Sequence, residues 1–283
     1  MTRSPTVRTS VRITGRITGR ISRRTFIHAV MAASAMAALL PGRAAHADVL
    51  ANIQKAGVIR VAIPNDFPPF GSLGTDLKLQ GYDIDMANLV AKELGVKAEL
   101  VPVTSTNRIP FLTTGKVDVV ISSLGKNAER AKVIDFTQAY APFPKSVYGP
   151  KDVSIKTPAD LAGKTIGVTR GSTEDLALTA VAPASATIKR YEDNNATAQS
   201  YLIGQVQLVT LGNIVANAVN ERTRLRQLDV KFPVEDTPCY VGVAKGEPAL
   251  LDKVNAAITK LKSDGRLNDL SQRWIKMPLP AKL

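Results

Sequence analysis

Residues 117–130 read VDVVISSLGKNAER, in which a short apolar run is followed by two serines, a glycine and then an arginine. The apolar run predicts a buried strand, because a strand covered on both faces shows no alternation of polar residues. The hydroxyls and backbone N–H groups that follow would lie at the carboxyl end of this strand, where open α/β sheets bind ligands. The planar guanidinium of Arg130 suits a carboxylate there. Alternatively, Arg130 caps a surface helix or pairs with Glu129 or Asp135.

Predicted strands and helices alternate on both sides of this stretch. The first series also contains strands at 58–63 and 98–103 and helices at 83–94 and 109–114. The second series follows Pro150 and contains strands at 165–168 and 206–209 and a helix at 174–181. Repeated β-α-β units predict an α/β fold with parallel sheets.

Two proline-containing segments, 140–144 and 237–241, end the first and the second series. We interpret them as crossings of the chain between two lobes. The predicted division is a signal peptide at 1–47, a lobe 1 made of 48–141 and 239–283, and a lobe 2 of 142–238. A cleft between two such lobes is a typical place for a small ligand.

The first 47 residues have the three parts of an export signal. Eight arginines occur there with no Asp, Glu or Lys, an Ala-rich apolar stretch occupies 26–40, and a small-residue cleavage site occupies 45–47. The run SRRTFI at 22–27 matches the twin-arginine pattern. We therefore expect Tat export, cleavage after Ala47 and a mature protein in a bacterial periplasm. A signal anchor or an organellar transit peptide is the alternative.

The net positive charge of the chain is distributed unevenly along the sequence. The whole chain carries 37 basic and 24 acidic residues, but the eight arginines of the signal leave 29 basic residues and a net charge of +5 for 48–283. This remainder is spread along the chain rather than gathered in a patch. The distribution argues against nucleic-acid binding.

The mature chain also lacks side chains that many enzymes need. Both histidines, His28 and His46, lie in the signal, which removes a Ser-His-Asp or Cys-His mechanism and a His-ligated metal site. The single cysteine, Cys239, can form neither an intrachain disulfide nor a zinc site, and we expect it to be a small buried side chain. No metal and no cofactor are expected.

Polar groups follow two other predicted strands. Ser172 and Thr173 precede the acidic start of a helix, which is either an ordinary capped helix or an anion site formed by its free N–H groups. Asp66 and Phe67 follow the first strand. Phe67 either lines a pocket there or packs within its own loop.

Seven short motifs occur in order along the chain: DFPPF at 66–70, GYDID at 81–85, NRIPFL at 107–112, GKVD at 115–118, AER at 128–130, DFT at 135–137 and DLAGKTIGV at 160–168. Together they resemble the polar amino-acid family of periplasmic solute-binding proteins, which feed ABC importers. The resemblance covers essentially all of 48–283 and implies two α/β lobes, joined by two hinge strands, that close on a ligand. The run STNRIP at 105–110 resembles the glutamate/aspartate-binding branch.

The resemblance implies a carboxylate site shared by both lobes. Arg130 corresponds to the arginine that binds the α-carboxylate of the ligand. Ser123 and Gly125 correspond to the neighbouring strand-end positions, although Gly125 lacks the hydroxyl. Ser172 and Thr173 correspond to the contact that lobe 2 makes with the same carboxylate.

The resemblance also implies two further contacts, one of which is altered in this chain. Arg108, with Ser105, corresponds to the arginine that holds the side-chain carboxylate in the acidic branch. The family usually has an aspartate for the ligand ammonium just after the strand predicted at 206–209, where this chain has Asn213. Either Asp66 replaces that aspartate, or the natural ligand is closer to a dicarboxylate.

The function implied by the resemblance is a monomeric, non-enzymatic periplasmic receptor. It would capture a small polar or acidic amino acid between its lobes and deliver it to the permease of a membrane ABC importer. The alternatives are a dicarboxylate-binding receptor and a periplasmic enzyme on the same fold, such as a cyclohexadienyl dehydratase. Asp66 and Glu174 are the candidate general acids for such an enzyme.

Overall fold

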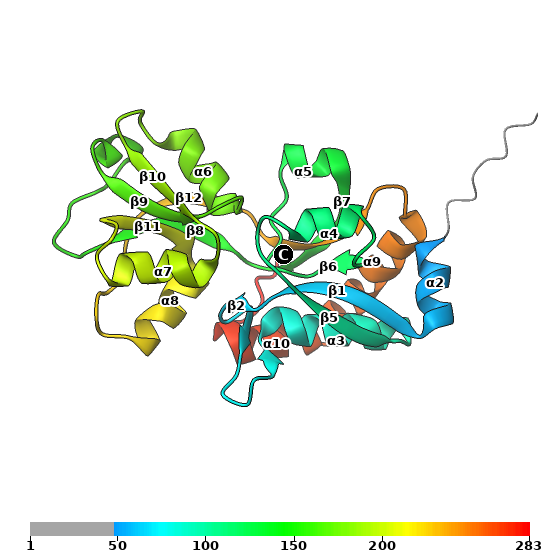
Figure 1. Cartoon of the computed structure of the whole chain (residues 1–283). Coiled ribbons are helices and arrows are strands. Elements are labelled where there is room, and N and C mark those ends of the chain that lie inside the picture. Colours follow the sequence, from blue (N-terminus) through cyan, green and yellow to red (C-terminus); the bar gives the residue numbers. More distant parts are fainter. Residues whose placement is uncertain (1–47) are drawn as a thin grey trace, which may run out of the picture. The chain divides into compact units, whose positions relative to one another are not determined.

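The computed structural model describes residues 48–283 (Figure 1); the predicted signal peptide and its cleavage site after Ala47 lie outside these residues. Two five-stranded sheets organise the described part of the chain. Sheet 1 has the order β5-β1-β6-β13-β7, which are Lys97–Val103, Val58–Pro64, Val119–Val120, Cys239–Ala244 and Ile134–Ala141. Sheet 2 has the order β10-β9-β11-β8-β12, which are Thr187–Tyr191, Thr165–Thr169, Leu208–Gly212, Pro144–Gly149 and Asp229–Asp236. We call the parts of the chain built around these sheets lobe 1 and lobe 2.

The chain passes between the sheets twice. It leaves sheet 1 at the end of β7, enters sheet 2 with β8, and returns from β12 to β13. The connections are residues 142–143 and 237–238, so each falls inside a segment that the sequence analysis interprets as a crossing. This path is the two-lobed α/β architecture that the sequence predicts.

The prediction of parallel sheets is wrong, because both sheets are mixed. In sheet 1, β1 pairs parallel with β5 and β6, whereas β13 pairs antiparallel with β6 and β7. In sheet 2, β9 pairs parallel with β10 and β11, whereas β8 pairs antiparallel with β11 and β12. The reason is the path of the chain: β8 and β13 are reached directly from β7 and β12 through two-residue connections, whereas a parallel neighbour requires a crossover, usually a helix.

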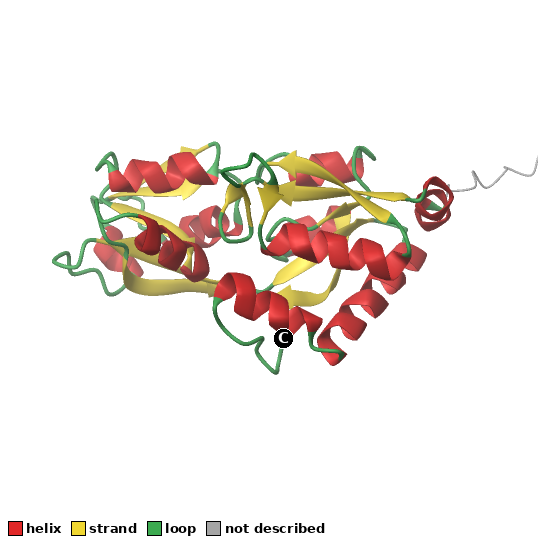
Figure 2. Ribbon diagram, turned by 90° about the horizontal axis from the view of Figure 1, so that it is seen from below, coloured by secondary structure: helices red, strands yellow, loops and turns green. Residues whose placement is uncertain are grey.

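Helices cover the outer faces of both groups of strands (Figure 2). In lobe 1, α3 packs against β1 and against two helices near the end of the chain. The helices of lobe 1 are α2 (Val49–Ala56), α3 (Tyr82–Leu94), α4 (Arg108–Thr113), α5 (Ala128–Val133), α9 (Pro248–Ser263) and α10 (Arg266–Ile275). Those of lobe 2 are the 3-10 helix η2 (Pro158–Leu161), α6 (Thr173–Val181), α7 (Asn194–Leu202) and α8 (Asn213–Arg222). A small sheet of β2 (Asp66–Phe67), β3 (Gly71–Leu73) and β4 (Leu79–Gln80) follows β1. Within 48–283, no helix is long and apolar enough to span a membrane.

Apolar burial explains why the carboxyl ends of the strands hold their positions. The inward side chains of β1, among them Ile59 and Val61, are completely buried in a cluster that also takes in α3 and α9. Burying each side chain of this size stabilises the fold by roughly 1.5–3 kcal/mol. Cys239 belongs to the same cluster and is fully buried, as predicted, and burial raises the pKa of its thiol well above the usual range.

Lys145, at the start of β8, is a charged residue placed where the two crossings meet. Its side chain is completely buried. Its Nζ donates to the carbonyl oxygens of Phe143 and Thr237, at 3.2 Å each, so it contacts both crossings at once. Nζ also lies 3.0 Å from Oε2 of Glu235, as an ion pair rather than an aligned hydrogen bond, and 4.8 Å from the centre of the Phe143 ring. These contacts replace the hydration that the buried ammonium loses.

Candidate ligand-binding site

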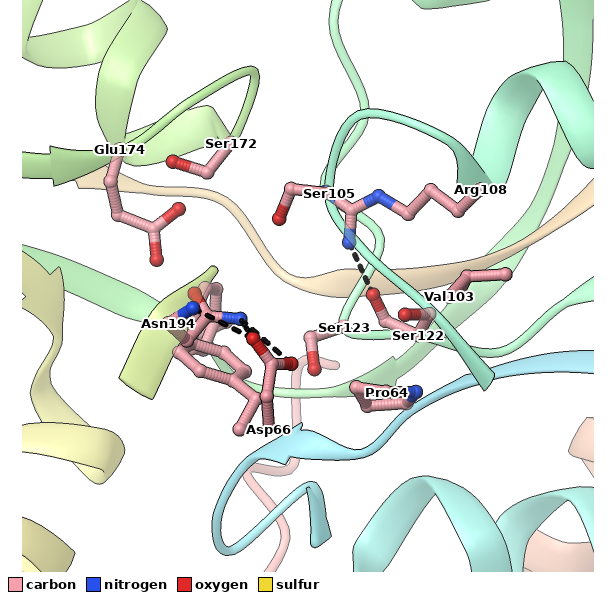
Figure 3. Close-up of a pocket in the computed structure, with 12 residues that line it drawn as sticks. Pro64, Asp66, Val103, Ser105, Arg108, Ser122, Ser123, Ser172, Glu174 and Asn194 are labelled. Atoms are coloured by element: carbon pink, nitrogen blue, oxygen red, sulfur yellow. Dashed lines mark hydrogen bonds between the residues drawn. The ribbon is translucent and has the colours of Figure 1, made fainter. Parts of the chain in front are cut away.

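A small pocket lies between the two lobes (Figure 3). Its walls come from the ends of β1, β5 and β6, from β2, from the first crossing, and from the starts of α4, α6 and α7. The lining residues are Pro64, Asp66, Phe67, Val103, Ser105, Arg108, Ser122, Ser123, Phe143, Ser172, Glu174 and Asn194. Six of them are predicted site residues: Asp66, Phe67, Ser105, Arg108, Ser123 and Ser172. The pocket encloses about 10 Å³, room for about one water molecule, so side chains in its lining must rearrange to hold a ligand of amino-acid size.

Arg108 opens α4 and places a buried positive charge against the pocket. Its side chain is 5% exposed, and Nη1 donates to the carbonyl oxygen of Ser122. Its Nε has no hydrogen-bond partner among the residues that the structure describes. Burial lowers the pKa of Arg108, and the negative charge of Glu174 acts in the opposite direction. The guanidinium therefore keeps donor capacity for a group in the pocket.

Ser123 is held by a carboxylate that lies behind the pocket. Its backbone N–H and its hydroxyl donate to Oδ2 of Asp83, at 2.7 and 3.0 Å, and the hydroxyl of Tyr140 donates to Oδ1 at 2.7 Å. Ser123 has a φ of 46°, a left-handed conformation that these bonds to Asp83 help to hold. Burial raises the pKa of Asp83 to about 6 despite the three bonds. The Ser123 oxygen can still accept a hydrogen bond from a ligand.

Asp66 connects the lobes across the pocket. Its carboxylate accepts from the backbone N–H of Asn194 at 2.7 Å and from Nδ2 of the same residue at 3.1 and 3.2 Å. Burial raises the pKa of Asp66, whereas the bonds from Asn194 lower it. Asn194 is a site residue that the sequence analysis missed, because α7 was not predicted.

Arg130 lies beside the pocket without lining it, and it also joins the lobes. Its Nη1 donates to the carbonyl oxygen of Gly125 at 2.7 Å, and its Nη2 donates to that of Gly171, in lobe 2, at 2.9 Å. Burial and the nearby charge of Arg108 lower the pKa of Arg130 to about 9.

The surface alternative for Arg130 does not match its surroundings. Arg130 is buried. Glu129 pairs instead with Lys132 at 2.6 Å, and Asp135 pairs with Lys245 at 2.5 Å.

Gly125 and Thr173 face each other from opposite lobes, next to the pocket. A Cβ at Gly125 would lie 2.7 Å from Cγ2 and 3.2 Å from Oγ1 of Thr173, so only a glycine fits this approach. Ser172 caps α6, since its Oγ accepts from the backbone N–H of Asp175 at 3.1 Å. Ser172 is therefore a helix cap that also lines the pocket, and the anion site stays a prediction.

Asn213 lies away from the pocket lining, where its Oδ1 accepts from the hydroxyl of Tyr148 at 2.8 Å. The predicted strand 206–209 runs instead from Leu208 to Gly212, so Asn213 is the first residue of α8. The lobe 2 carboxylate that does line the pocket is Glu174, 5% exposed, whose Oε2 accepts from Oγ1 of Thr173 at 3.2 Å. Figure 3 shows Glu174 pointing toward the space between the lobes.

Comparison with known proteins agrees with this architecture. A family described as bacterial extracellular solute-binding proteins, family 3, matches residues 59–277. The chain is 30% identical to the glutamine-binding protein of an ABC transporter in Bacillus subtilis (strain 168), over 81% of this chain and 85% of that protein. It is also 30% identical to an L-arginine-binding protein of Pseudomonas aeruginosa, over 76% and 87%.

A solved structure gives the same result. The crystal structure of an ancestral amino acid-binding protein, described as a precursor of cyclohexadienyl dehydratase, superposes with a TM-score of 0.75 at 32% identity, covering 80% of this chain and 99% of that one. The chain belongs to the family 3 bacterial extracellular solute-binding proteins. The two curated relatives are named for different amino acids, so they do not assign this chain to the glutamate/aspartate-binding branch.

Proposed function

We propose that this protein is an exported receptor that captures a small amino acid between its lobes and delivers it to the permease of a membrane ABC importer. One observation carries the proposal: a buried guanidinium from lobe 1 and a buried carboxylate from lobe 2 face the same pocket. Charged groups of both signs suit a ligand that has both a carboxylate and an ammonium. The proposed lobe boundaries are 48–141 with 239–283 for lobe 1 and 142–238 for lobe 2, and the receptor is proposed to act as a monomer.

Binding tests the proposal directly. The exported protein is titrated by isothermal calorimetry with the twenty standard L-amino acids, L-cystine, succinate and 2-oxoglutarate. We expect one site per chain, filled by at least one amino acid, and a smaller radius of gyration by solution scattering at saturation, because ligand contacts divided between two lobes favour their closure. Binding of the dicarboxylates alone, or of no compound in the set, would contradict the proposal.

The enzymatic alternative rests on the two carboxylates, Asp66 and Glu174, that line the pocket. Burial raises the pKa of Asp66, which is the direction that a general acid requires. Both oxygens of Asp66 are nevertheless bonded to Asn194, so we propose binding without turnover. Purified protein should leave prephenate and arogenate unchanged; steady formation of an aromatic product would establish the dehydratase instead.

Export is proposed to follow the twin-arginine route into the periplasm, with cleavage after Ala47. Replacing Arg23 and Arg24 together with lysine should leave the precursor in the cytoplasm of the host. Normal processing of the double variant would instead indicate export through the Sec pathway.

A further inference from the structure

A second pocket also has walls from both lobes, and among the described residues it shares no lining side chain with the candidate ligand-binding site, the first pocket. Its volume is about 580 Å³, and small-molecule sites measure about 300–1,000 Å³. Lobe 1 supplies the small sheet and the end of α10, and Figure 1 shows α8 and α10 in different lobes. Lobe 2 supplies one face of α8, whose lining residues recur at intervals of three and four: Ile214, Asn217, Ala218, Glu221 and Arg222.

Part of the lining of the second pocket is apolar. Ile214 and Ile275 are buried there, and Trp274 is half-buried. Nε1 of Trp274 donates to Oδ2 of Asp85 at 2.8 Å, which holds the indole in place. Met277, 47% exposed, adds a flexible apolar side chain. The second pocket therefore offers apolar surface to the non-polar part of a ligand.

The charged part of the same lining is mainly positive, with three cations and one acid: Arg222, Arg273, Lys276 and Glu221. Two of the cations are already engaged. Nη1 of Arg273 lies 3.2 Å from Oδ2 of Asp85, and Nζ of Lys276 donates to the carbonyl oxygen of Arg273 at 2.8 Å. The side chain of Arg222 forms no ion pair and no hydrogen bond with any residue of 48–283. Arg222 is therefore the cation with capacity left for an anionic group.

Both pockets border the small sheet. Asp66 of β2 lines the first pocket, Ser72 of β3 lines the second, and these two residues are paired in the sheet. The lobes touch directly in this structure, since Asp66 accepts from Asn194 at 2.7 Å, so the second pocket has the shape that belongs to closed lobes. A ligand that fits its walls as they stand stabilises the closed arrangement, because it contacts both lobes.

We propose that the second pocket binds an amphipathic anion, a molecule with one acidic group and an apolar chain, and that this ligand favours closure of the lobes. Arg222 contacts the acidic group, and the apolar chain packs against Trp274 and Met277. By thermodynamic linkage, the anion and an amino acid in the first pocket raise each other's affinity by the same factor. This second site goes beyond the proposed function, which concerns the first pocket alone.

Fluorescence reports directly on the second pocket, because Trp274 is the only tryptophan of the chain. The exported wild-type protein is titrated with octanoate and with octylammonium, which have the same chain length and opposite charges. We expect octanoate to change the emission of Trp274 saturably and to bind about tenfold or more tightly than octylammonium. No saturable change with octanoate, or equal binding of the two probes, overturns the inference and leaves Arg222 as a favourable charge at the end of α8.

Arg222→Gln keeps a polar side chain and removes the charge. Octanoate should bind about fivefold or more weakly to this variant, whereas octylammonium should bind as well as before or better, because a repelling cation is gone. Arg224→Gln is the matched control, because Arg224 is exposed, follows α8 closely and lies outside the lining; its affinity for octanoate should equal that of the wild type. A loss in both variants alike, or in neither, overturns the placement of the anion at Arg222.

The coupling between the pockets is measured with the tightest-binding amino acid. Its affinity is determined with and without saturating octanoate, and that of octanoate with and without the amino acid; both should rise by the same factor, roughly fivefold or more. Competition would place octanoate in the first pocket, and independent binding would show that the second pocket does not favour closure. Either result overturns the inference and leaves the proposed function intact.

If no amino acid binds, the proposed function fails and the second site is still tested. Saturating octanoate should then lower the radius of gyration in solution scattering, because it favours closed lobes. A radius that does not fall overturns the inference independently of the amino acid.

Discussion

Gly125→Ala should weaken ligand binding without weakening the fold. The added Cβ would lie 2.7 Å from Cγ2 of Thr173, whereas carbon atoms in contact prefer about 3.5–4.0 Å. Thr173 cannot turn aside easily, because it is buried and its β-branched side chain has few rotamers. The backbone of Gly125 is outside the left-handed region, so alanine brings no conformational strain of its own. The lobes must therefore stay roughly 1 Å further apart at this point.

The size of the effect follows from where the two residues lie. Overpacking a close contact costs about 1–3 kcal/mol. Only the closed arrangement carries this cost, because Gly125 and Thr173 belong to different lobes. Affinity for the tightest-binding amino acid should then fall about 5- to 150-fold by calorimetry. The midpoint of thermal unfolding measured without added ligand should stay within about 1 °C of wild type.

A second substitution checks the cause. Thr173→Ser removes Cγ2, the atom at 2.7 Å, and keeps the hydroxyl, whose oxygen would lie 3.2 Å from the new Cβ. Gly125→Ala combined with Thr173→Ser should therefore recover most of the lost affinity, while Thr173→Ser alone changes it little. An unchanged affinity in Gly125→Ala, or no recovery in the double variant, would refute the idea that this approach limits closure.

Three further outcomes are expected. Burial raises the pKa of Asp83 to about 6 from an ordinary 3.8, so the folded protein favours the neutral carboxyl. The stability that this preference contributes is complete below about pH 3.8 and is lost as the pH rises through 6. Urea unfolding should show wild type losing roughly 2 kcal/mol relative to Asp83→Asn between pH 4 and pH 7, and a difference that is constant with pH would contradict this. Arg130→Ala should cost ~2–5 kcal/mol of binding free energy, which is about 30-fold or more in affinity. Arg170→Ala is the control, because Arg170 is exposed. A loss of affinity below threefold by calorimetry would make Arg130 a structural residue only. The buried Cys239 thiol should react with a disulfide reagent at least 100-fold more slowly in folded than in urea-unfolded protein, and comparable rates would show that the crossing opens readily.

The sequence predicted those elements whose residues are strongly patterned. The predicted helix at 83–94 is α3, from Tyr82 to Leu94, because its apolar spacing is regular and Gly95 supplies a left-handed C-cap. In contrast, α7 reads NNATAQSYL and has too few apolar residues to show a helical period. Strand β12 contains Pro233, which lowers a strand prediction but is tolerated here at the edge of sheet 2.

In the candidate site, the predictable residues are those that follow the ends of predicted strands. Arg108, Ser123 and Ser172 follow predicted strands, and the structure brings all three to one pocket. The contact of Asp66 with Asn194 was not predictable, since it joins residues 128 positions apart through a helix without a clear pattern. Whether Glu174 points toward the pocket depends on how the start of α6 faces the other lobe, and no local property of the sequence determines that.

The position of Lys145 has a consequence for the signal that an importer receives. One ammonium bonds to the carbonyl oxygens of Phe143 and Thr237, so neither crossing can twist alone without parting Nζ from a buried acceptor. Leaving such a group unpaired costs about 1–3 kcal/mol or more, so the two crossings turn together. We therefore expect the lobes to swing about a single shared axis. A permease that docks on both lobes would then distinguish the open from the closed receptor by one rotation angle, rather than by independent movements of the two crossings.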